Sequence, residues 1–326
     1  MLKKQSIIQA SRACIVLLVS ITLFNGCSLW PANVGQAQEA KKPTLYPATQ
    51  GLYESCSPFD GDICLNHLKT IAAAGFTLVV NYNQLYGTEA QELAYAKEAH
   101  SLGIQIIWDM SEPIFWNGND VRAEYKDLAA TCSCSDNSAF IAYVINLVKR
   151  LPATWGYYIG DEAPAENHDS LKAFADAVRQ LDPGHPRLYI AGENASTMGA
   201  NVKPFVDSAE VVGGDIYPVS TSDPITSVGE ISHAIQAILD QHGNQSAIVL
   251  QAFNWGEYPK DSWVCSKFPA CAHFPTREEM SLMRNLVIKN AHPQFILWYS
   301  YFDINRSDDP AGHMEDLIKA ASSPVI

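Results

Sequence analysis

The stretch FTLVVNYNQLYGTEAQELAYAKEAHSLGIQIIWDM, residues 76–110, contains two apolar runs with a helical pattern between them. The runs FTLVVNY (76–82) and IQIIWDM (104–110) are nearly continuous in apolar residues, which is typical of strands buried on both faces. The segment between them begins with Thr88, which favours a helix N-cap, and ends at Gly103, which favours a helix end. This stretch therefore predicts a strand, a helix and a second strand.

The same alternation of short apolar runs and amphipathic segments continues from residue 50 to the end of the chain. Eight runs with eight helical segments are what a single (β/α)8 barrel of roughly 250 residues needs. The alternative, an open doubly wound sheet, usually has a glycine-rich phosphate turn after its first strand. Residues 54–62, ESCSPFDGD, form no such turn, so the barrel is the predicted fold. The predicted strands are residues 51–55, 76–82, 104–110, 155–162, 187–193, 211–219, 247–255 and 295–303.

The N-terminus predicts export. Lys3 and Lys4 precede an apolar run at residues 13–24, which is short for a membrane span and leads to Cys27. This order resembles a bacterial lipoprotein signal, in which cleavage precedes a cysteine that receives lipid. We therefore expect a lipid anchor on Cys27 that holds the protein to the outer face of a bacterial membrane.

These features divide the chain into three parts. We expect a signal peptide at 1–26, a tether without periodicity at 27–44 and a barrel domain at 45–326. Ordinary secretion, with cleavage after Ala37, is the alternative to the lipid anchor.

Cysteine use agrees with export. Of the eight cysteines, Cys14 leaves with the signal and Cys27 would carry lipid, and an even remainder in an exported chain predicts disulfides. We expect bridges between the cysteines that lie close in sequence, 56 with 64 and 265 with 271. A bridge between residues 132 and 134 would be strained, and a metal site there lacks further ligands at zinc-like spacing. The disulfide candidates are Cys56, Cys64, Cys132, Cys134, Cys265 and Cys271.

The acidic balance limits the partners. The net charge is −13 and no cluster of lysine and arginine occurs after residue 42, whereas nucleic acids are bound by such clusters. We therefore expect no nucleic-acid partner, a neutral rather than an anionic ligand, membrane contact only through the lipid anchor, and a monomer. The motifs HxH, HExxH, GxGxxG, GxSxG and the P-loop do not occur, so we expect neither a metal nor a cofactor.

Acidic and aromatic side chains end the predicted strands. In a (β/α)8 barrel the active site lies at the carboxyl ends of the strands, where the following loops meet. Aromatic faces stack on the C–H faces of sugar rings, and carboxylates and amides bind sugar hydroxyls. The sequence therefore predicts a carbohydrate site. Its expected substrate-binding residues are Trp108, Asp109, Tyr217, Asn254, Trp255, Trp298 and Tyr301.

The stretch WGYYIGDEAP, residues 155–164, ends a predicted strand with two adjacent acids. Hydrolysis of a glycosidic bond needs one protonated acid and one ionised carboxylate, and acids crowded into an apolar rim raise the pKa of one of them. We expect Glu162 to be the protonated acid. Asp161 should point elsewhere, because side chains alternate along a strand. The structural alternative is that the two acids partly cap the next helix.

The arrangement resembles the retaining TIM-barrel glycoside hydrolases over residues 50–305. In that superfamily an acid/base glutamate ends strand four, a nucleophile glutamate ends strand seven, a tyrosine follows strand six and a tryptophan ends strand eight. The resemblance implies that Glu162 is the acid/base and that Tyr217 and Trp298 hold the tyrosine and tryptophan positions. GDEAP (160–164) is also similar to the DEP pattern of several poorly characterised glycosidase-like barrels.

Two residues depart from the superfamily's pattern. Asp161 stands where an asparagine usually precedes the acid/base, and Gln251 stands near the place of the nucleophile, although an amide cannot attack as a carboxylate does. We therefore expect Asp215, which leaves a strand end directly, to be the second catalytic carboxylate. The other residues with a possible catalytic or binding role are Asp161, Glu193, Gln251, Glu257 and Asp303.

The predicted function is hydrolysis of O-glycosidic bonds outside the cytoplasm. The main alternative is a catalytically inactive, carbohydrate-binding lipoprotein, in which Gln251 marks lost catalysis. A hydrolase of another class is disfavoured by the missing metal and nucleophile motifs.

Overall fold

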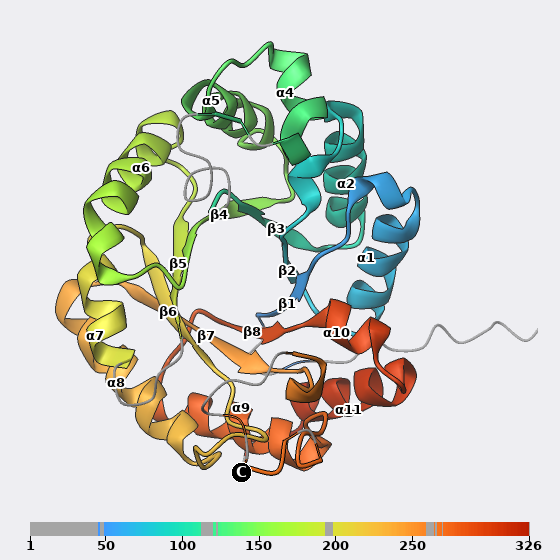
Figure 1. Cartoon of the computed structure of the whole chain (residues 1–326), viewed down its shortest axis with the longest axis vertical. Helices are drawn as coiled ribbons and strands as arrows, with labels where there is room; N and C mark the ends of the chain where they lie inside the picture. Colours follow the sequence, from blue (N-terminus) through green and yellow to red (C-terminus); the bar gives the residue numbers. More distant parts are fainter. Residues whose placement is uncertain are drawn as a thin grey trace, which may run out of the picture. The chain divides into compact units, whose positions relative to one another are not determined.

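Eight parallel strands form a closed barrel. A computed structural model of the protein describes residues 45, 49–111, 120–121, 123–192, 198–258, 264, 266–268 and 270–325. Neighbouring strands pair in sequence order, and the last strand pairs with the first (Figure 1). The predicted (β/α)8 fold is confirmed. The strands are β1 (Gln50–Glu54), β2 (Leu78–Asn81), β3 (Gln105–Asp109), β4 (Thr154–Asp161), β5 (Arg187–Ala191), β6 (Val211–Ile216), β7 (Gln245–Gln251) and β8 (Phe295–Tyr299).

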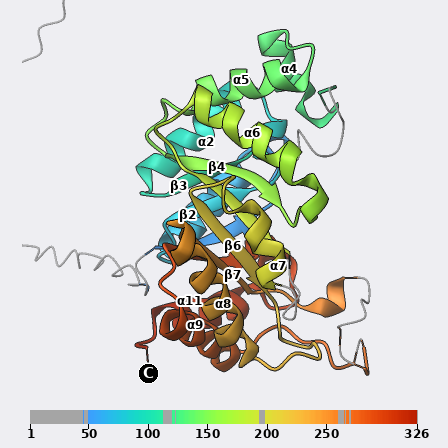
Figure 2. The same ribbon diagram turned by 90° about the vertical axis from the view of Figure 1, so that its left-hand side faces the viewer.

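Helices cover the outside of the barrel. Figure 2 shows α6, α7 and α8 on one side of it, outside β4 to β6. None of the helices in the described ranges is both long and apolar enough to cross a membrane. The helices are α1 (Ile63–Ala73), α2 (Glu89–Ser101), α4 (Lys126–Cys132), α5 (Asn137–Val148), α6 (His168–Leu181), α7 (Met198–Val202), α8 (Ser227–His242), α9 (Arg277–Asn290), α10 (Tyr301–Arg306) and α11 (Pro310–Ser322).

The unit predicted first, strand, helix and strand, is present as β2, α2 and β3. β2 and β3 pair in parallel, with Leu78 opposite Gln105. The hydroxyl of Thr88 accepts a hydrogen bond from the N–H of Gln91, and the side chain of Gln91 accepts one from the N–H of Thr88. This capping box satisfies two backbone donors that the first turn of a helix otherwise leaves unpaired.

Side chains on the strands alternate between two apolar layers. One cluster takes residues from all eight strands and fills the barrel, and the other joins the outer faces of the strands to the helices. On β8, Phe295 and Leu297 belong to the inner cluster, whereas Ile296 and Trp298 belong to the outer one. The position of a residue along its strand therefore decides whether its side chain can reach a site at the barrel end.

The last strand is shorter than predicted. β8 ends at Tyr299, and the hydroxyl of Ser300 then accepts a hydrogen bond from the N–H of Asp303 and caps α10. Tyr301 and Asp303 consequently lie on a helix and not at a strand end.

The described cysteines form disulfides. Cys56 and Cys64 are bridged, as predicted, with Cα atoms 5.5 Å apart. Cys132 and Cys134 are also bridged, although their spacing made this pair doubtful. Cys271 is disulfide-bonded. Cys265, Cys27, the predicted signal at 1–26 and the predicted tether at 27–44 lie outside the described residues.

Candidate functional site

A cavity of about 750 Å³ lies at the carboxyl ends of β1 to β4 and β8. This is the end of a (β/α)8 barrel at which active sites occur. The lining combines acidic, hydroxyl, amide and aromatic side chains and includes no lysine, arginine or histidine among its described residues. These residues are Ser55, Tyr82, Asn83, Ser111, Asp161, Glu162, Ala163, Pro164, Asn167 and Tyr299.

Asp161 and Glu162 both line the cavity, which corrects the expectation that Asp161 points elsewhere. The register of β4 against β5 shifts between Tyr158 and Gly160, so the alternation of side chains is interrupted there. Glu162 then adopts a φ of 47°, in the left-handed region, while its N–H donates to the carbonyl of Ile190 on β5. The irregular strand end thus brings two adjacent carboxyl groups to one cavity.

Two tyrosine hydroxyls hold the carboxyl group of Asp161. The hydroxyl of Tyr158 on β4 lies 2.5 Å from Oδ1, and that of Tyr82, after β2, lies 3.3 Å from Oδ2. Hydrogen bonds donated to a carboxylate favour its ionised form. The two tyrosines therefore orient Asp161 and favour its negative charge.

Asp215 on β6 contacts Glu162. Its side chain is buried, at 5% exposure, and it forms hydrogen bonds with the carboxyl of Glu162 and the hydroxyl of Tyr217. Burial raises the pKa of Asp215 well above its usual range, and the nearby carboxylates of Asp161 and Glu162 raise it further. The structure thus brings together Glu162, Asp215 and Tyr217, and it favours a protonated Asp215 that donates to Glu162.

Two glycines make room for this arrangement. A Cβ atom on Gly192, just after β5, would lie 3.0 Å from both Cβ and Cγ of Glu162. A Cβ atom on Gly213 of β6 would lie 2.1 Å from the carbonyl oxygen of Ala247 on β7. The first glycine therefore gives Glu162 its place, and the second lets β6 approach β7 two residues before Asp215.

The site also contains a cluster of tyrosines of which the sequence analysis named only Tyr217. The ring of Tyr53 lies 5.4 Å from that of Tyr82 and 5.3 Å from that of Tyr299, between centroids. Burial raises the pKa of each ring in the cluster above its usual range, so the hydroxyls remain donors. The tyrosine cluster consists of Tyr53, Tyr82, Tyr158, Tyr217 and Tyr299.

Two members of the tyrosine cluster, Tyr53 and Tyr299, were not selected from the sequence, although strand alternation could have identified them. Tyr53 belongs to the inner apolar cluster, and Tyr299 packs against it. Leu297, two positions before Tyr299 on β8, is also an inner residue. Side chains two positions apart on a strand share a face. The alternation along β8 therefore predicts that Tyr299, and not Trp298, points into the barrel towards the site.

Three aromatic residues predicted to bind substrate face away from the cavity. Trp108 is 1% exposed and its indole N–H donates to the hydroxyl of Thr154 at 2.9 Å; Trp298 is 0% exposed. Both belong to the outer cluster, as does Tyr301, whose ring packs 5.0 Å from that of His67. Their assignment to substrate is therefore wrong, because strand alternation and the start of α10 turn them towards the helices.

The side chain of Gln251 is hydrogen-bonded to backbone groups of two neighbouring loops. Its side chain is buried; its Oε1 accepts from the N–H of Val219 at 2.8 Å. Its Nε2 donates to the carbonyls of Val219 and Phe253 at 3.2 and 3.1 Å. Gln251 thus joins the loops that follow β6 and β7 and does not line the cavity.

Glu257 and Asp303 form ion pairs outside the cavity lining. Both contact Arg306, at 3.2 Å and 2.5 Å respectively. Asp303 is buried and accepts a hydrogen bond from the hydroxyl of Tyr258 at 2.8 Å. Burial raises the pKa of Asp303, while these donors oppose the shift. Both acids therefore stabilise the loop after β7 against α10.

The remaining predicted residues support the site indirectly. Asp109 accepts hydrogen bonds from the N–H and hydroxyl of Ser111, a cavity residue, at 2.8 and 2.6 Å. The side chain of Asn254 caps the turn that contains Trp255, and the Trp255 ring lies 6.4 Å from that of Tyr217. Glu193 lies outside the described residues.

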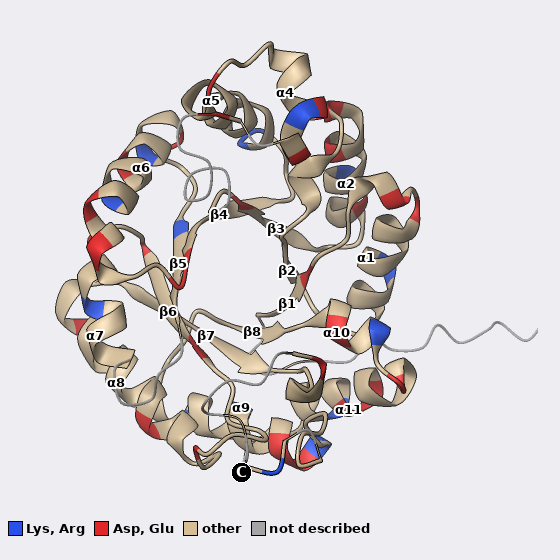
Figure 3. Ribbon diagram, viewed as in Figure 1, with Lys and Arg blue, Asp and Glu red and all other residues tan. Residues whose placement is uncertain are grey.

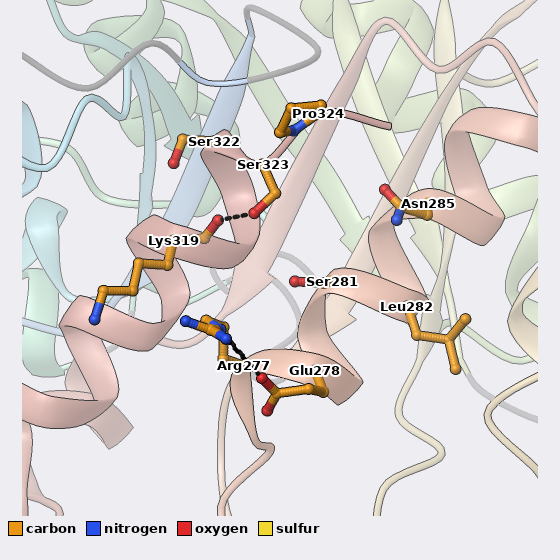
Figure 4. A pocket seen from close by; sticks show the side chains of 9 residues that line it. All are labelled: Arg277, Glu278, Ser281, Leu282, Asn285, Lys319, Ser322, Ser323 and Pro324. Carbon is orange, nitrogen blue, oxygen red and sulfur yellow. Dashed lines mark hydrogen bonds and ion pairs between the residues drawn. The ribbon is translucent and has the colours of Figure 1, made fainter. Parts of the chain in front are cut away.

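A second hollow, of about 650 Å³, lies between α9 and α11 (Figure 4). Glu278 is the single acid among the described residues that line it, and it pairs with the adjacent Arg277, so these residues offer no carboxyl pair for catalysis. Within the described ranges, no group of three or more histidine, cysteine, aspartate and glutamate residues is placed to hold a metal ion.

Comparisons with known proteins agree with the fold. No protein-family model and no curated protein sequence matches the chain. A putative α-L-fucosidase from Bacteroides thetaiotaomicron is similar in structure, with a TM-score of 0.55 and 13% identity over 87% of this chain and 98% of that one. A GH113 β-1,4-mannanase gives 0.53 and 11% over 85% and 98%, and a β-glucuronidase from Faecalibacterium prausnitzii gives 0.52 and 13% over 87% and 50%. These structural neighbours are glycoside hydrolases, and the chain is a TIM barrel of the same fold.

Proposed function

We propose that the protein is an extracytoplasmic glycoside hydrolase that cleaves O-glycosidic bonds with Glu162 and Asp161, and that Asp215 positions Glu162. The observation that carries the proposal is the contact between the carboxyl groups of Glu162 and Asp215 beside a cavity of about 750 Å³ at the carboxyl ends of the strands. The likeness of the fold to glycoside hydrolases supports the same class of reaction.

The exposure of the two acids distinguishes their roles. Glu162 lines the cavity, so it is the acid that reaches the oxygen of the glycosidic bond and protonates it as the bond to the anomeric carbon breaks. Asp215 is buried and acts through Glu162, as a positioning residue that holds a proton beside it.

A third carboxyl group completes the chemistry. Carboxyls that flank a glycosidic bond lie roughly 5 to 9.5 Å apart, whereas Glu162 and Asp215 are in hydrogen-bond contact and cannot lie on opposite sides of one. Asp161, which lines the cavity and is held by Tyr158 and Tyr82, is the carboxylate that stabilises the positive charge developing on the sugar. Water then adds to the anomeric carbon and gives one proton to Glu162, which restores the acid, while Asp161 stays ionised.

Tyrosines supply the binding surface. Tyr82 and Tyr299 line the cavity and offer ring faces to the C–H faces of a sugar, while Asn83 and Ser111 offer groups that bind hydroxyls. Of the residues predicted to bind substrate, Tyr217 remains next to the site through its hydrogen bond to Asp215, the partner of Glu162.

The test is turnover of a broad panel of glycans by the wild type and by Glu162→Gln, read as new reducing ends. Loss of the titrating proton should lower turnover by roughly 10²–10⁴-fold on natural linkages, while sugar binding survives. Binding of sugars without any turnover by the wild type would instead favour the inactive binding protein. One observation favours that alternative. Gln251 lies in the region of the usual nucleophile, and its amide group is hydrogen-bonded to backbone groups.

We also propose that the chain is exported and anchored by lipid on Cys27. The bridges Cys56–Cys64 and Cys132–Cys134 support this, because disulfides persist in oxidising compartments. Mass spectrometry of the mature N-terminus should find a lipidated Cys27. An unmodified start near Gln38 would contradict the anchor and leave export standing.

A further inference from the structure

Two loops form one side of the cavity, those that follow β1 and β2. They supply three residues of its lining, Ser55, Tyr82 and Asn83. Backbone pairing joins the two strands as far as the N–H of Tyr82, which donates to the carbonyl of Glu54 at 3.0 Å. Beyond this bond, side-chain amides connect the two loops.

The buried side chain of Asn81, the last residue of β2, makes one of these connections. It is 1% exposed. Its Nδ2 donates to the carbonyl of Cys56 at 3.0 Å and to Oε1 of Gln84 at 3.1 Å. Its Oδ1 accepts from the N–H of Asn83 at 3.1 Å. An amide has two donor hydrogens and a carbonyl oxygen, so all of these groups are used and the orientation of Asn81 is fixed.

Both loop partners of Asn81 are themselves anchored to helices. Cys56 is bridged to Cys64 on α1, and Nε2 of Gln84 donates to Glu92 on α2 at 2.7 Å. Asn81 therefore bonds to groups that have little freedom to move, and it holds the turn after β2 against the loop after β1. Binding groups are placed accurately when the residues behind them are fixed by packing and hydrogen bonds.

The turn that Asn81 holds brings Asn83 to the cavity. Asn83 is half-buried and lines the cavity. Its Nδ2 donates to the carbonyl of Ser55 at 2.7 Å. Because a carbonyl can only accept, the bonded end of this amide must be its nitrogen. The other end, Oδ1, can accept a hydrogen bond from a hydroxyl of a ligand.

Neutral side chains make up this part of the wall. Residues 78–88, which comprise β2 and the turn after it, contain no charged side chain (Figure 3). A sugar hydroxyl that meets Asn83 therefore forms a hydrogen bond between neutral groups, and the strength of such a bond depends on its distance and angle. The position of the Asn83 amide is consequently what decides the strength of this contact.

We propose that Asn83 binds a sugar hydroxyl through Oδ1 and that Asn81 is the residue that positions Asn83 for this contact. The inference rests on the proposed function, since it concerns the same cavity. The network of Asn81 joins the ends of β1 and β2, whereas Glu162 follows β4. We therefore expect a change in this network to alter KM rather than kcat.

The experiment is a double-mutant cycle of Asn81→Ala and Asn83→Ala. The probes are p-nitrophenyl glycosides of glucose, galactose, mannose and fucose, together with cellotetraose and mannotetraose, and the probe that the wild type cleaves fastest is used throughout. Each single variant should raise KM roughly 3- to 10-fold, as loss of one neutral hydrogen bond does, and change kcat less than about twofold. The double variant should have the KM of Asn83→Ala alone, because Asn81 then has no binding group to position.

Asn244→Ala is the matched control. Asn244 precedes β7, at the end of the barrel opposite the cavity. Its Nδ2 donates to the carbonyls of Val206 and Ala209, both at 2.8 Å. This variant also removes an amide that joins two backbone segments, so it should lower the urea midpoint as Asn81→Ala does but leave KM unchanged. If Asn81→Ala does not fold, Asn81→Ser takes its place in the cycle, since a hydroxyl keeps a polar group in the buried space.

Each outcome decides a different claim. An unchanged KM in Asn83→Ala would overturn the contact with the sugar. Effects that multiply in the double variant, or an equal rise of KM in Asn244→Ala, would overturn the positioning role of Asn81, and all three results leave the proposed function standing. If the wild type binds a probe in calorimetry but cleaves none, the proposed function fails and the same cycle is read in Kd. If no probe is bound or cleaved, the proposed function and this inference both fail.

Discussion

The carboxyl group of Asp215 on β6 forms a hydrogen bond with the carboxyl group of Glu162 at the end of β4. The two acids differ in environment, because Asp215 is buried while Glu162 lines the cavity. The nearby carboxyl of Glu162 is one of the causes that raise the pKa of Asp215. A substitution of Asp215 should therefore affect both the free energy of unfolding and the rate of turnover.

Replacement of Asp215 by asparagine should affect turnover and the pH dependence of stability differently. The folded-state pKa of Asp215 is raised, so its stabilising contribution is complete below the unfolded pKa of about 4 and is lost as the pH rises towards the folded value. An amide side chain at this position would be neutral at every pH and would still donate to Glu162. We therefore expect Asp215→Asn to lower turnover much less than Glu162→Gln, and to have a flatter dependence of unfolding free energy on pH than the wild type. Urea denaturation between pH 4 and 8 measures it, and parallel curves for variant and wild type would contradict it.

Gly192→Ala tests how closely Glu162 must be placed. The added Cβ would lie 3.0 Å from Cβ and 3.1 Å from Cδ of Glu162, so the glutamate must move by a few tenths of an ångström. Because a displacement of about 1 Å can cost 10²-fold in rate, we expect kcat to fall by about three- to tenfold with the fold intact. The control is Gly199→Ala in α7, whose Cβ would meet only the end of Ile238 at 3.3 Å. An equal effect of both changes would argue against the placement of Glu162 as the cause.

Adjacent tyrosines on β4 offer a matched pair of variants. Tyr158→Phe removes the 2.5 Å hydrogen bond to Asp161 in the cavity, and Tyr157→Phe removes a 2.6 Å bond to Asp182 in the outer layer. Both should destabilise the protein by about 1 kcal/mol. Only Tyr158→Phe should lower kcat/KM, by about tenfold, because only its partner, Asp161, lines the cavity. Equal losses of activity would show that Tyr158 acts through stability alone.

Glu92 on α2 should make the fold sensitive to pH independently of the site. Its carboxyl is buried beside Gln84, whose Nε2 donates to it at 2.7 Å. Burial raises the pKa of Glu92 to about 8, so stability is fully present below about pH 4 and is lost as the pH rises to 8, by up to about 1.4 kcal/mol per unit. Glu92→Gln should flatten that part of the curve without changing the pH profile of kcat. An unchanged slope of stability against pH would contradict the buried, protonated state.

Sequence alone could predict the barrel because burial patterns and helix caps are local. The runs that became β2 and β3 and the cap at Thr88 lie within one continuous stretch. The same locality explains why Glu162 and Asp215 could be selected: each closely follows an apolar run, and parallel strands bring such ends together.

The sequence could not show which way each strand-end side chain points. The register shift between Tyr158 and Gly160 turns Asp161 into the cavity, and such a shift depends on pairing with β5, far along the chain. The start of α10 after Ser300 depends on a single hydroxyl cap that competes with continuation of the strand. Trp298 was the exception, since the alternation visible in β8 would have placed it outside.

The central claim is that Glu162 gives a proton to the leaving group, and aryl glycosides with a graded series of leaving groups test it most directly. We expect wild-type kcat/KM to change little across the series, while Glu162→Gln loses about 10²–10⁴-fold on the poorest leaving group and little on the most acidic one. Glu257→Gln, paired with Arg306 away from the cavity, should follow the wild type throughout. A Glu162→Gln variant that follows the wild type on every leaving group would contradict the account.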